Sequence, residues 1–332
     1  MPKILKNLSQ YFLIVAITGL LIWLSLRGLK VHEGQNKFDF ILTAWEEAGK
    51  TQLMLMALVA FLSHYVRAVR WKMLLLPTEN KIKTGSALIS ILIGYLVNLG
   101  VPRGGEVSRC YNLFKLEKTP ISVSFGTVII ERIVDVICLF LVVVLAFIFE
   151  WGKLLEFIDS LDISSNKLHL PLWVIYSIGG IIILIFVAFL FRKNQKLLSF
   201  INGFKAGFSS LFRLKNKWLF IFYSILIWAL YYLMTYFTVQ AFQSTADLNF
   251  SAVLSVFALG SIAMAMPLPG GAGSYHTIVP LGLFMLYKLP MEEAIAFVFV
   301  FHAWQTLVMI IMGVISLLIT YRLVKRNKSE TI

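Results

Sequence analysis

A charged motif interrupts an otherwise apolar part of this sequence. It contains Arg103, Glu106 and Arg109, beside the flexible pair Gly104 and Gly105. Charges at membrane depth are costly unless they are paired or hydrated, so they tend to be functional. Arginine forks onto phosphate oxygens, and free N–H groups beside glycines can hold an anion. The motif predicts a site for an anion such as a lipid headgroup phosphate. Two alternatives stay open: Glu106 pairs with Arg103 or Arg109 only to fix a turn, or the loop lies in water.

A second charged motif, Glu131, Arg132 and Asp135, lies inside an apolar stretch. In a helix these residues fall within one arc, and Arg132 can pair with Asp135 three residues later or with a neighbour. The arc must face protein or a cavity, because contact with lipid would be very costly. A structural ion-pair lock between helices and a translocation path are equally compatible with this pattern.

A third motif is rich in proline and glycine and contains neither an acid nor an arginine. Half-helix ends at such a break expose backbone groups that can bind charge. Its histidine could titrate near neutral pH, although a single histidine is more often simply hydrogen-bonded. The candidate residues here are Pro269, Gly270, Gly271, Gly273, Ser274, Tyr275 and His276.

Further basic residues lie in the apolar run 52–76. His64, Arg67 and Trp71 share one stripe of the expected helix, while Arg70 and Lys72 fall near its end. The favoured interpretation is that these basic side chains anchor the helix at the cytoplasmic rim of the membrane.

The elements that must position these motifs are membrane helices. The chain has 332 residues, of which 59% are hydrophobic and 14% charged, with a mean hydropathy of +0.82. Soluble domains carry about 25% charged residues, so much apolar surface would be left in water. Six runs are long enough to span a bilayer, and two regions, 85–118 and 250–289, are broken by the first and third motifs. We expect an all-α polytopic membrane protein with six spanning helices and two re-entrant helical hairpins. The spans are predicted at 9–26, 52–76, 121–149, 172–191, 218–243 and 293–320.

The charge distribution predicts the topology. With both termini cytoplasmic, 22 Lys and Arg residues lie on the inner side and 7 on the outer side. This is the asymmetry of a protein in the cell membrane, and it accounts for the net charge of +13 without a nucleic acid partner. The two cysteines, Cys110 and Cys138, form no disulfide or metal-site pattern.

The order of elements repeats along the chain. Residues 1–170 and 171–332 each run span, span, hairpin, span, and Pro102 in the first break aligns with Pro269 in the second. Since each half has three spans, the second half starts on the opposite face. This predicts an inverted-topology repeat of the kind found in many transporters.

At these motifs the sequence resembles the flippase-like, lysylphosphatidylglycerol synthase transmembrane-region family, which includes the membrane half of the multiple peptide resistance factor. One departure concerns His276, where the family usually has a glutamate. The resemblance covers essentially the whole chain and implies movement of a phospholipid or related amphiphile between leaflets. The family's synthase domain normally follows the membrane part, and this chain ends shortly after the last predicted span, so we expect no aminoacyl transfer. The matching residues are Asn98, Pro102, Arg103, Gly105, Glu106 and Arg109; Glu131, Arg132 and Asp135; Pro269, Gly270, Gly271 and Gly273; and the segment from Arg67 to Trp71.

Three functional hypotheses follow. The first is a lipid flippase or transporter that needs no cofactor and has membrane lipids as partners. The second is an enzyme, or a membrane subunit beside a separately encoded lipid-modifying enzyme, of polyprenyl-phosphate or glycolipid metabolism. The third is a non-transporting scaffold. The sequence contains no H-E-x-x-H, G-x-S-x-G or P-loop motif, which disfavours catalysis, and it leaves self-association into a homo-oligomer open.

Overall fold

The computed structural model describes residues 36–160, 195–266 and 268–329, together with 20, 22, 23, 25 and 26. Within this part of the chain the regular structure is helical: ten α-helices and three short 3-10 turns, with no strand. The predicted all-α class is therefore confirmed for the described residues. Two of the six predicted spans, 9–26 and 172–191, lie wholly or largely outside them.

Among the described residues, four helices are long and apolar enough to cross a membrane. They begin close to the starts of the spans predicted at 52–76, 121–149, 218–243 and 293–320, but α6 and α12 continue well past the predicted ends. The last turns of α6 follow a kink at Glu150, whose backbone is not helical (φ −131°, ψ 36°). The four helices are α3 (Lys50–Leu75), α6 (Ile121–Ser160), α9 (Lys217–Val239) and α12 (Met291–Ser329).

Shorter helices form two hairpins at the predicted breaks. The first hairpin consists of α4 (Thr84–Gly100) and α5 (Gly104–Glu117). The second consists of α10 (Phe250–Ala265) and α11 (Ser274–Tyr287), joined through the 3-10 turn η4 (Pro269–Gly271). All four helices are shorter than the roughly 20 residues that a span requires.

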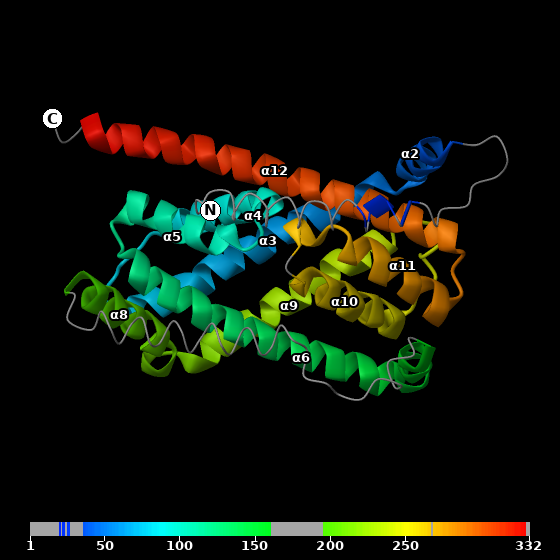
Figure 1. The fold of residues 1–332 in the computed structure, drawn as a ribbon, viewed down its shortest axis with the longest axis horizontal. Helices are drawn as coiled ribbons and strands as arrows, with labels where there is room; N and C mark the ends of the chain where they lie inside the picture. Colours follow the sequence, from blue (N-terminus) through cyan, green and yellow to red (C-terminus); the bar gives the residue numbers. More distant parts are fainter. Residues whose placement is uncertain are drawn as a thin grey trace, which may run out of the picture.

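The two hairpins lie toward opposite ends of the long axis in Figure 1. The long helices α6 and α12, each of which comes after a hairpin in the chain, run along opposite edges. Each hairpin ends at a lysine with left-handed backbone, Lys118 (φ 59°) or Lys288 (φ 56°). A proline two residues later, Pro120 or Pro290, immediately precedes the next long helix. Proline suits the start of a helix because it has no N–H to leave unpaired there.

Two helices were not predicted. They lie between predicted spans: α2 (Lys37–Glu47) precedes the span at 52–76, and α8 (Gln195–Phe208) precedes the span at 218–243. Glycines let α8 pack very closely on the start of α6, since a Cβ at Gly207 would lie only 2.1 Å from the carbonyl oxygen of Val123. This backbone-to-backbone approach is typical of small residues at membrane-helix interfaces.

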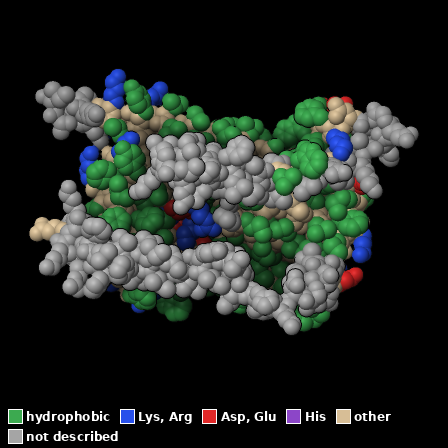
Figure 2. Space-filling model, in the orientation of Figure 1, with side chains coloured by type: hydrophobic (Ala, Val, Ile, Leu, Met, Phe, Trp, Pro, Cys, Tyr) green, Lys and Arg blue, Asp and Glu red, His purple; other side chains and the backbone are tan. Residues whose placement is uncertain are grey.

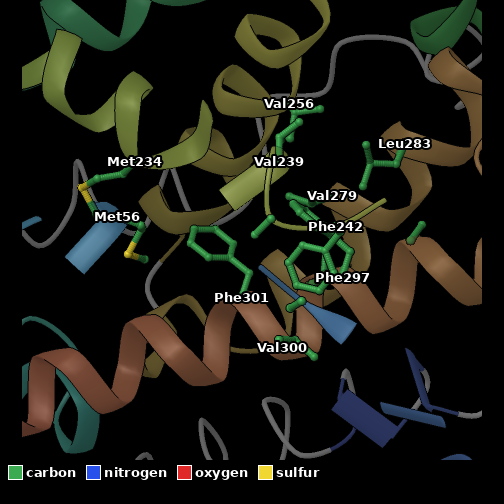
Figure 3. Close-up of a cluster of buried hydrophobic side chains, with 14 of the residues drawn as sticks. Met56, Met234, Val239, Phe242, Val256, Val279, Leu283, Phe297, Val300 and Phe301 are labelled. Atoms are coloured by element: carbon green, nitrogen blue, oxygen red, sulfur yellow. The ribbon is translucent and has the colours of Figure 1, made fainter. Parts of the chain in front are cut away.

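The largest apolar core joins α3, α9, α10, α11 and α12 (Figure 3). Phe242 and Phe297 meet in it edge to face, with ring centroids 5.1 Å apart. Outside this core, α6 presents a broad apolar surface, and residues such as Phe140 and Ile148 are exposed. Apolar surface of this extent marks contact with lipid or with another chain.

Candidate functional site

The charged residues of α3, α5 and α6 meet in one place. We call this set the charged cluster, and its centre is the carboxylate of Glu131, which is fully buried. Oε1 of Glu131 lies 2.6 Å from Nε of Arg67 and 3.4 Å from Nη2 of Arg70, while Oε2 lies 3.2 Å from Nη2 of Arg109. The full cluster comprises Arg67, Arg70, Glu106, Arg109, Glu131, Arg132 and Asp135.

The second carboxylate of α6, Asp135, binds the same two arginines of α3. Its Oδ2 lies 2.6 Å from Nη2 of Arg67 and its Oδ1 lies 2.7 Å from Nη2 of Arg70. Arg67 also donates through Nη1 to the hydroxyls of Tyr95 (2.8 Å) and Tyr231 (3.0 Å). Helices α3, α4, α6 and α9 are thus tied together at this point, and charge-assisted hydrogen bonds of this kind are the strong ones.

The remaining ion pair lies at the edge of the cluster. Nη2 of Arg132 is 3.0 Å from Oε1 of Glu106, and Nη1 of Arg132 is 3.8 Å from Oδ2 of Asp135. The side chain of Arg132 is 40% exposed, whereas those of Arg67 and Arg109 are 4% exposed. Figure 2 shows basic and acidic side chains grouped near the middle of one face, between hydrophobic ones. The Arg132–Glu106 pair is therefore the accessible part of an otherwise buried cluster.

A small pocket lies beside this pair. The space open to a water-sized sphere is about 10 Å³, enough for one water molecule. Three atoms around it are buried without a hydrogen-bond partner: Nε of Arg109, Nε of Arg132 and Oε2 of Glu106. Unsatisfied buried polar atoms of this kind call for a further partner. The lining residues are Ile91, Gly94, Tyr95, Asn98, Gly105, Glu106, Arg109 and Arg132.

The first break places Arg109 and Glu106 through a tight turn. Gly105 donates its N–H to Oδ1 of Asn98 at 2.7 Å, which ties α5 back to α4. A Cβ at Gly105 would lie 2.1 Å from the carbonyl oxygen of Gly94, so only glycine permits this approach of the two helices. The turn itself is made by Val101, Pro102 and Arg103, with Gly104 as the first residue of α5.

The two hairpins meet at their tips. Arg103 has left-handed backbone (φ 59°), and its Nη2 donates to the carbonyl oxygen of Ala265 at 3.3 Å, at the end of α10. A Cβ at Gly270 would lie 3.1 Å from a methyl group of Leu99. The breaks of the first and second hairpins are therefore neighbours in space, although 162 positions separate Arg103 from Ala265.

The candidate residues of the second break form a separate group. His276 lies against His302, with ring centroids 4.7 Å apart, and Nε2 of His302 hydrogen-bonds the carbonyl oxygen of Gly270 at 3.0 Å. Ser274 donates to the carbonyl oxygens of Ala263 and Gly271. Tyr275 stacks on His302. Pro269, Gly271 and Gly273 complete the turn, where both glycines have positive φ.

Among the contacts of the described residues, no ion pair or side-chain hydrogen bond joins this second group to the charged cluster. In the same part of the chain no set of three or more His, Cys, Asp or Glu side chains could hold a metal ion. Arginines keep their charge when buried, so those of the cluster can pair chemically with an anion.

Several sequence predictions are corrected here. Arg67 and Arg70 do not anchor the end of α3 at a membrane surface: both are buried and pair with Glu131 and Asp135. The sequence signal for their burial is their spacing of three residues, followed directly by Trp71. This spacing puts all three side chains on one stripe of the helix. Trp71 in turn lies under the guanidinium of Arg109, whose Cζ is 4.8 Å from the ring centroid.

The predicted approach of Arg132 to Asp135 is present, whereas the alternative pairing of Glu106 within the first break is not. Glu106 pairs with Arg132, not with Arg103 or Arg109. The main partners of Asp135 are the arginines of α3, and its approach to Arg132 is the longest of its ion pairs. Glu106 reaches Arg132 because α5 packs against α6, a contact that spacing within the first break does not reveal.

Comparison with known proteins places the chain among membrane proteins. It is 28% identical over 270 residues to a UPF0104 membrane protein of Pyrococcus horikoshii, covering 74% of this chain and 79% of that protein. It is 26% identical over 138 residues to a UPF0104 membrane protein of Methanocaldococcus jannaschii, covering 41% and 38% of the two chains. No solved structure matches it. The family model of the lysylphosphatidylglycerol synthase transmembrane region matches residues 11–313, so this multi-pass membrane protein belongs to that family.

Proposed function

We propose that this protein is a lipid translocator that moves a phospholipid or a related anionic amphiphile between the leaflets of the cell membrane. The observation that carries the proposal is the charged cluster. It combines four arginines with three carboxylates, so it has one positive charge in excess. Structural locks usually balance their charges, because an unpaired charge in a low-dielectric interior is strongly destabilising.

An anionic headgroup needs what this cluster provides. A lipid phosphate that leaves water must find replacement partners along its path. Arg109 and Arg132 line one pocket, and each has an Nε–H without a hydrogen-bond partner. Arginine keeps its charge when buried and matches the geometry of phosphate oxygens.

The hairpins support a path for such a headgroup. In the proposed arrangement, both hairpins are re-entrant, enter from opposite sides of the membrane and meet at their tips near its middle. The helices of each hairpin and the long helix that follows it have matching lengths. They have 17, 14 and 40 residues in α4, α5 and α6, and 16, 14 and 39 residues in α10, α11 and α12. This agreement supports the inverted repeat of 1–170 and 171–332, the architecture in which alternating access is common.

The described conformation is closed in this proposal. A pocket of about 10 Å³ holds one water and is too small for a phosphate group. Translocation therefore requires a second conformation in which α5 and α6 part beside Arg132. A lipid favours that state only if its headgroup binds there more tightly than in the closed one.

The experiment is reconstitution into vesicles with fluorescent phosphatidylglycerol, where a membrane-impermeant quencher reports transfer to the outer leaflet. Wild type should accelerate transfer over protein-free vesicles, and Arg109→Gln should reduce it at least about tenfold, since one charged hydrogen-bond partner of a transferred group typically contributes that much. Glu131 keeps Arg67 and Arg70 in this variant, so the fold should persist. Arg322→Gln, an exposed arginine near the end of α12, is the matched control.

Two results would contradict the proposal. Transfer by Arg109→Gln at the wild-type rate would show that the charged cluster is only structural. Absence of transfer by wild type for every headgroup tested would instead favour a membrane subunit or enzyme of polyprenyl-phosphate or glycolipid metabolism.

A further inference from the structure

The carboxylate of Glu106 occupies the place of an anion at the edge of the charged cluster. We propose that a substrate phosphate replaces Glu106 on Arg132, and that the site takes amphiphiles whose headgroup is a singly charged phosphodiester. This inference rests on the proposed function and specifies its substrate class.

The Arg132–Glu106 pair is the least satisfied part of the cluster. Oε2 of Glu106 and Nε of Arg132 are both buried without a hydrogen-bond partner. Arg67, by contrast, uses Nε, Nη1 and Nη2 in four hydrogen bonds. Glu106 and Arg132 are also its most exposed members, at 19% and 40% for the two side chains. An incoming anion therefore meets this pair first. Separating this pair also costs less free energy than separating the other ion pairs of the cluster.

The position of Glu106 suits an anion for a second reason. It lies in the first turn of α5, where unpaired N–H groups and the helix dipole favour negative charge. The Nε–H of Arg109, on the next turn of α5, has no hydrogen-bond partner, and Arg109 lines the same pocket. A phosphate in place of the carboxylate could pair with Arg132 and also offer a further oxygen to the Nε–H of Arg109.

The surroundings of the pair fit a lipid and not a free anion. Val107 next to Glu106 is 56% exposed, and Ile133 and Val136, on either side of Asp135 in α6, are 42% and 65% exposed. Acyl chains can cover these apolar side chains while the headgroup reaches Arg132. Burial of apolar surface stabilises such a complex, and inorganic phosphate has no apolar surface to bury.

Charge balance sets the headgroup class. With all groups ionised, the four arginines and three carboxylates leave one positive charge. A phosphodiester carries a single negative charge and neutralises the cluster. A phosphomonoester carries about −1.5 to −2 at neutral pH, so it would leave an excess negative charge in a low-dielectric site.

The test compares two lipids with identical acyl chains, phosphatidylmethanol and phosphatidate, which differ in one methyl group and in headgroup charge. Their apparent affinities for the purified protein in detergent are measured from the shift in melting temperature. Wild type should bind phosphatidylmethanol more tightly by about tenfold, the low end of what a mismatched charge costs at a buried site. Glu106→Gln raises the excess charge to two, so the preference should reverse in favour of phosphatidate.

Two controls keep the test decisive. Glu117→Gln removes a carboxylate from the other end of α5, where it binds Ser86, and should preserve the wild-type preference. Should Glu106→Gln not fold, Arg132→Gln, which leaves the cluster without excess charge, should bind both lipids at least about tenfold more weakly than wild type. Inorganic phosphate and glycerophosphomethanol, the deacylated headgroup, should give no shift at the concentrations at which the lipids act.

The inference is overturned by an unchanged preference in Glu106→Gln, or by equal binding of the two lipids to wild type. Stabilisation by inorganic phosphate or glycerophosphomethanol as strong as by the lipids would make the ligand a free anion and would also overturn it. Failure of the proposed function looks different: phosphatidylmethanol would bind with the expected preference, yet reconstituted wild type would transfer no lipid.

Discussion

Arg67 lies 64 positions before Glu131 in the chain, yet its Nε is 2.6 Å from Oε1 of that carboxylate. Both side chains are almost completely buried. The contact joins α3 to α6 inside a set of charges that an apolar environment would otherwise penalise by several kcal/mol per ion. Glu131 also receives Arg70 and Arg109, so it pairs with three of the four arginines of the cluster.

Replacing this carboxylate should therefore be severe. Glu131→Gln leaves three buried arginines with one fewer negative charge, and we expect a loss of about 3–5 kcal/mol in the free energy of unfolding. Thermal unfolding of the purified protein in detergent measures the effect. The matched control is Glu47→Gln, an exposed carboxylate of α2, which should change stability by less than about 0.5 kcal/mol. Equal melting temperatures for the two variants would mean that the cluster contributes nothing to the fold.

The close crossing of α4 and α5 leads to a second prediction. A Cβ at Gly105 would lie 2.1 Å from the carbonyl oxygen of Gly94 and 2.7 Å from the side chain of Asn98. Gly105→Ala must separate α4 from α5, so we expect a loss of about 1–3 kcal/mol together with reduced lipid transfer, because Arg109 moves with α5. Limited proteolysis and thermal unfolding detect the change in the hairpin.

Gly85→Ala is the matched control for that variant. Nothing lies within 4 Å of a Cβ at Gly85, which is in the first turn of α4. Alanine there should be neutral or should stabilise by about 0.4–1 kcal/mol. A Gly105→Ala protein as stable as Gly85→Ala would contradict the close crossing of the two helices.

The sequence predicted long helices better than side-chain partners. The spans of α3, α6, α9 and α12 follow from apolar length alone, and the hairpin turns follow from Pro102, Pro269 and their glycines. The partners of Arg67 and Arg70 are 64 and 65 residues away, which no local spacing reveals. Helix α8 has 14 residues and is shorter than the apolar run of about 20 residues from which spans are predicted, whereas glycines pack it against α6.

The topology remains a prediction from charge. Three of the 22 basic residues assigned to the inner side, Arg67, Arg70 and Arg109, are buried in the cluster, but the inner excess persists without them. Reporter fusions at Lys328 should be active only as cytoplasmic reporters, and fusions within 150–170 only as external ones. A fusion at Lys328 that reports an external location would reverse the assignment of both hairpins.

The last prediction separates structure from transport within α6. Asp135→Asn removes the close partner of both Arg67 and Arg70, at 2.6 and 2.7 Å, and should cost about 3–5 kcal/mol of stability. Arg132→Gln breaks a pair whose arginine is 40% exposed, so its stability cost should be at most about 1 kcal/mol. Transfer of labelled phosphatidylglycerol should nevertheless fall strongly in Arg132→Gln, because this arginine is the one that an entering headgroup can reach. The two variants are compared by thermal unfolding and by the vesicle transfer assay on the same preparations. If Arg132→Gln transfers lipid at the wild-type rate while Asp135→Asn alone unfolds, the whole cluster is a structural lock and the exposed arginine has no part in translocation.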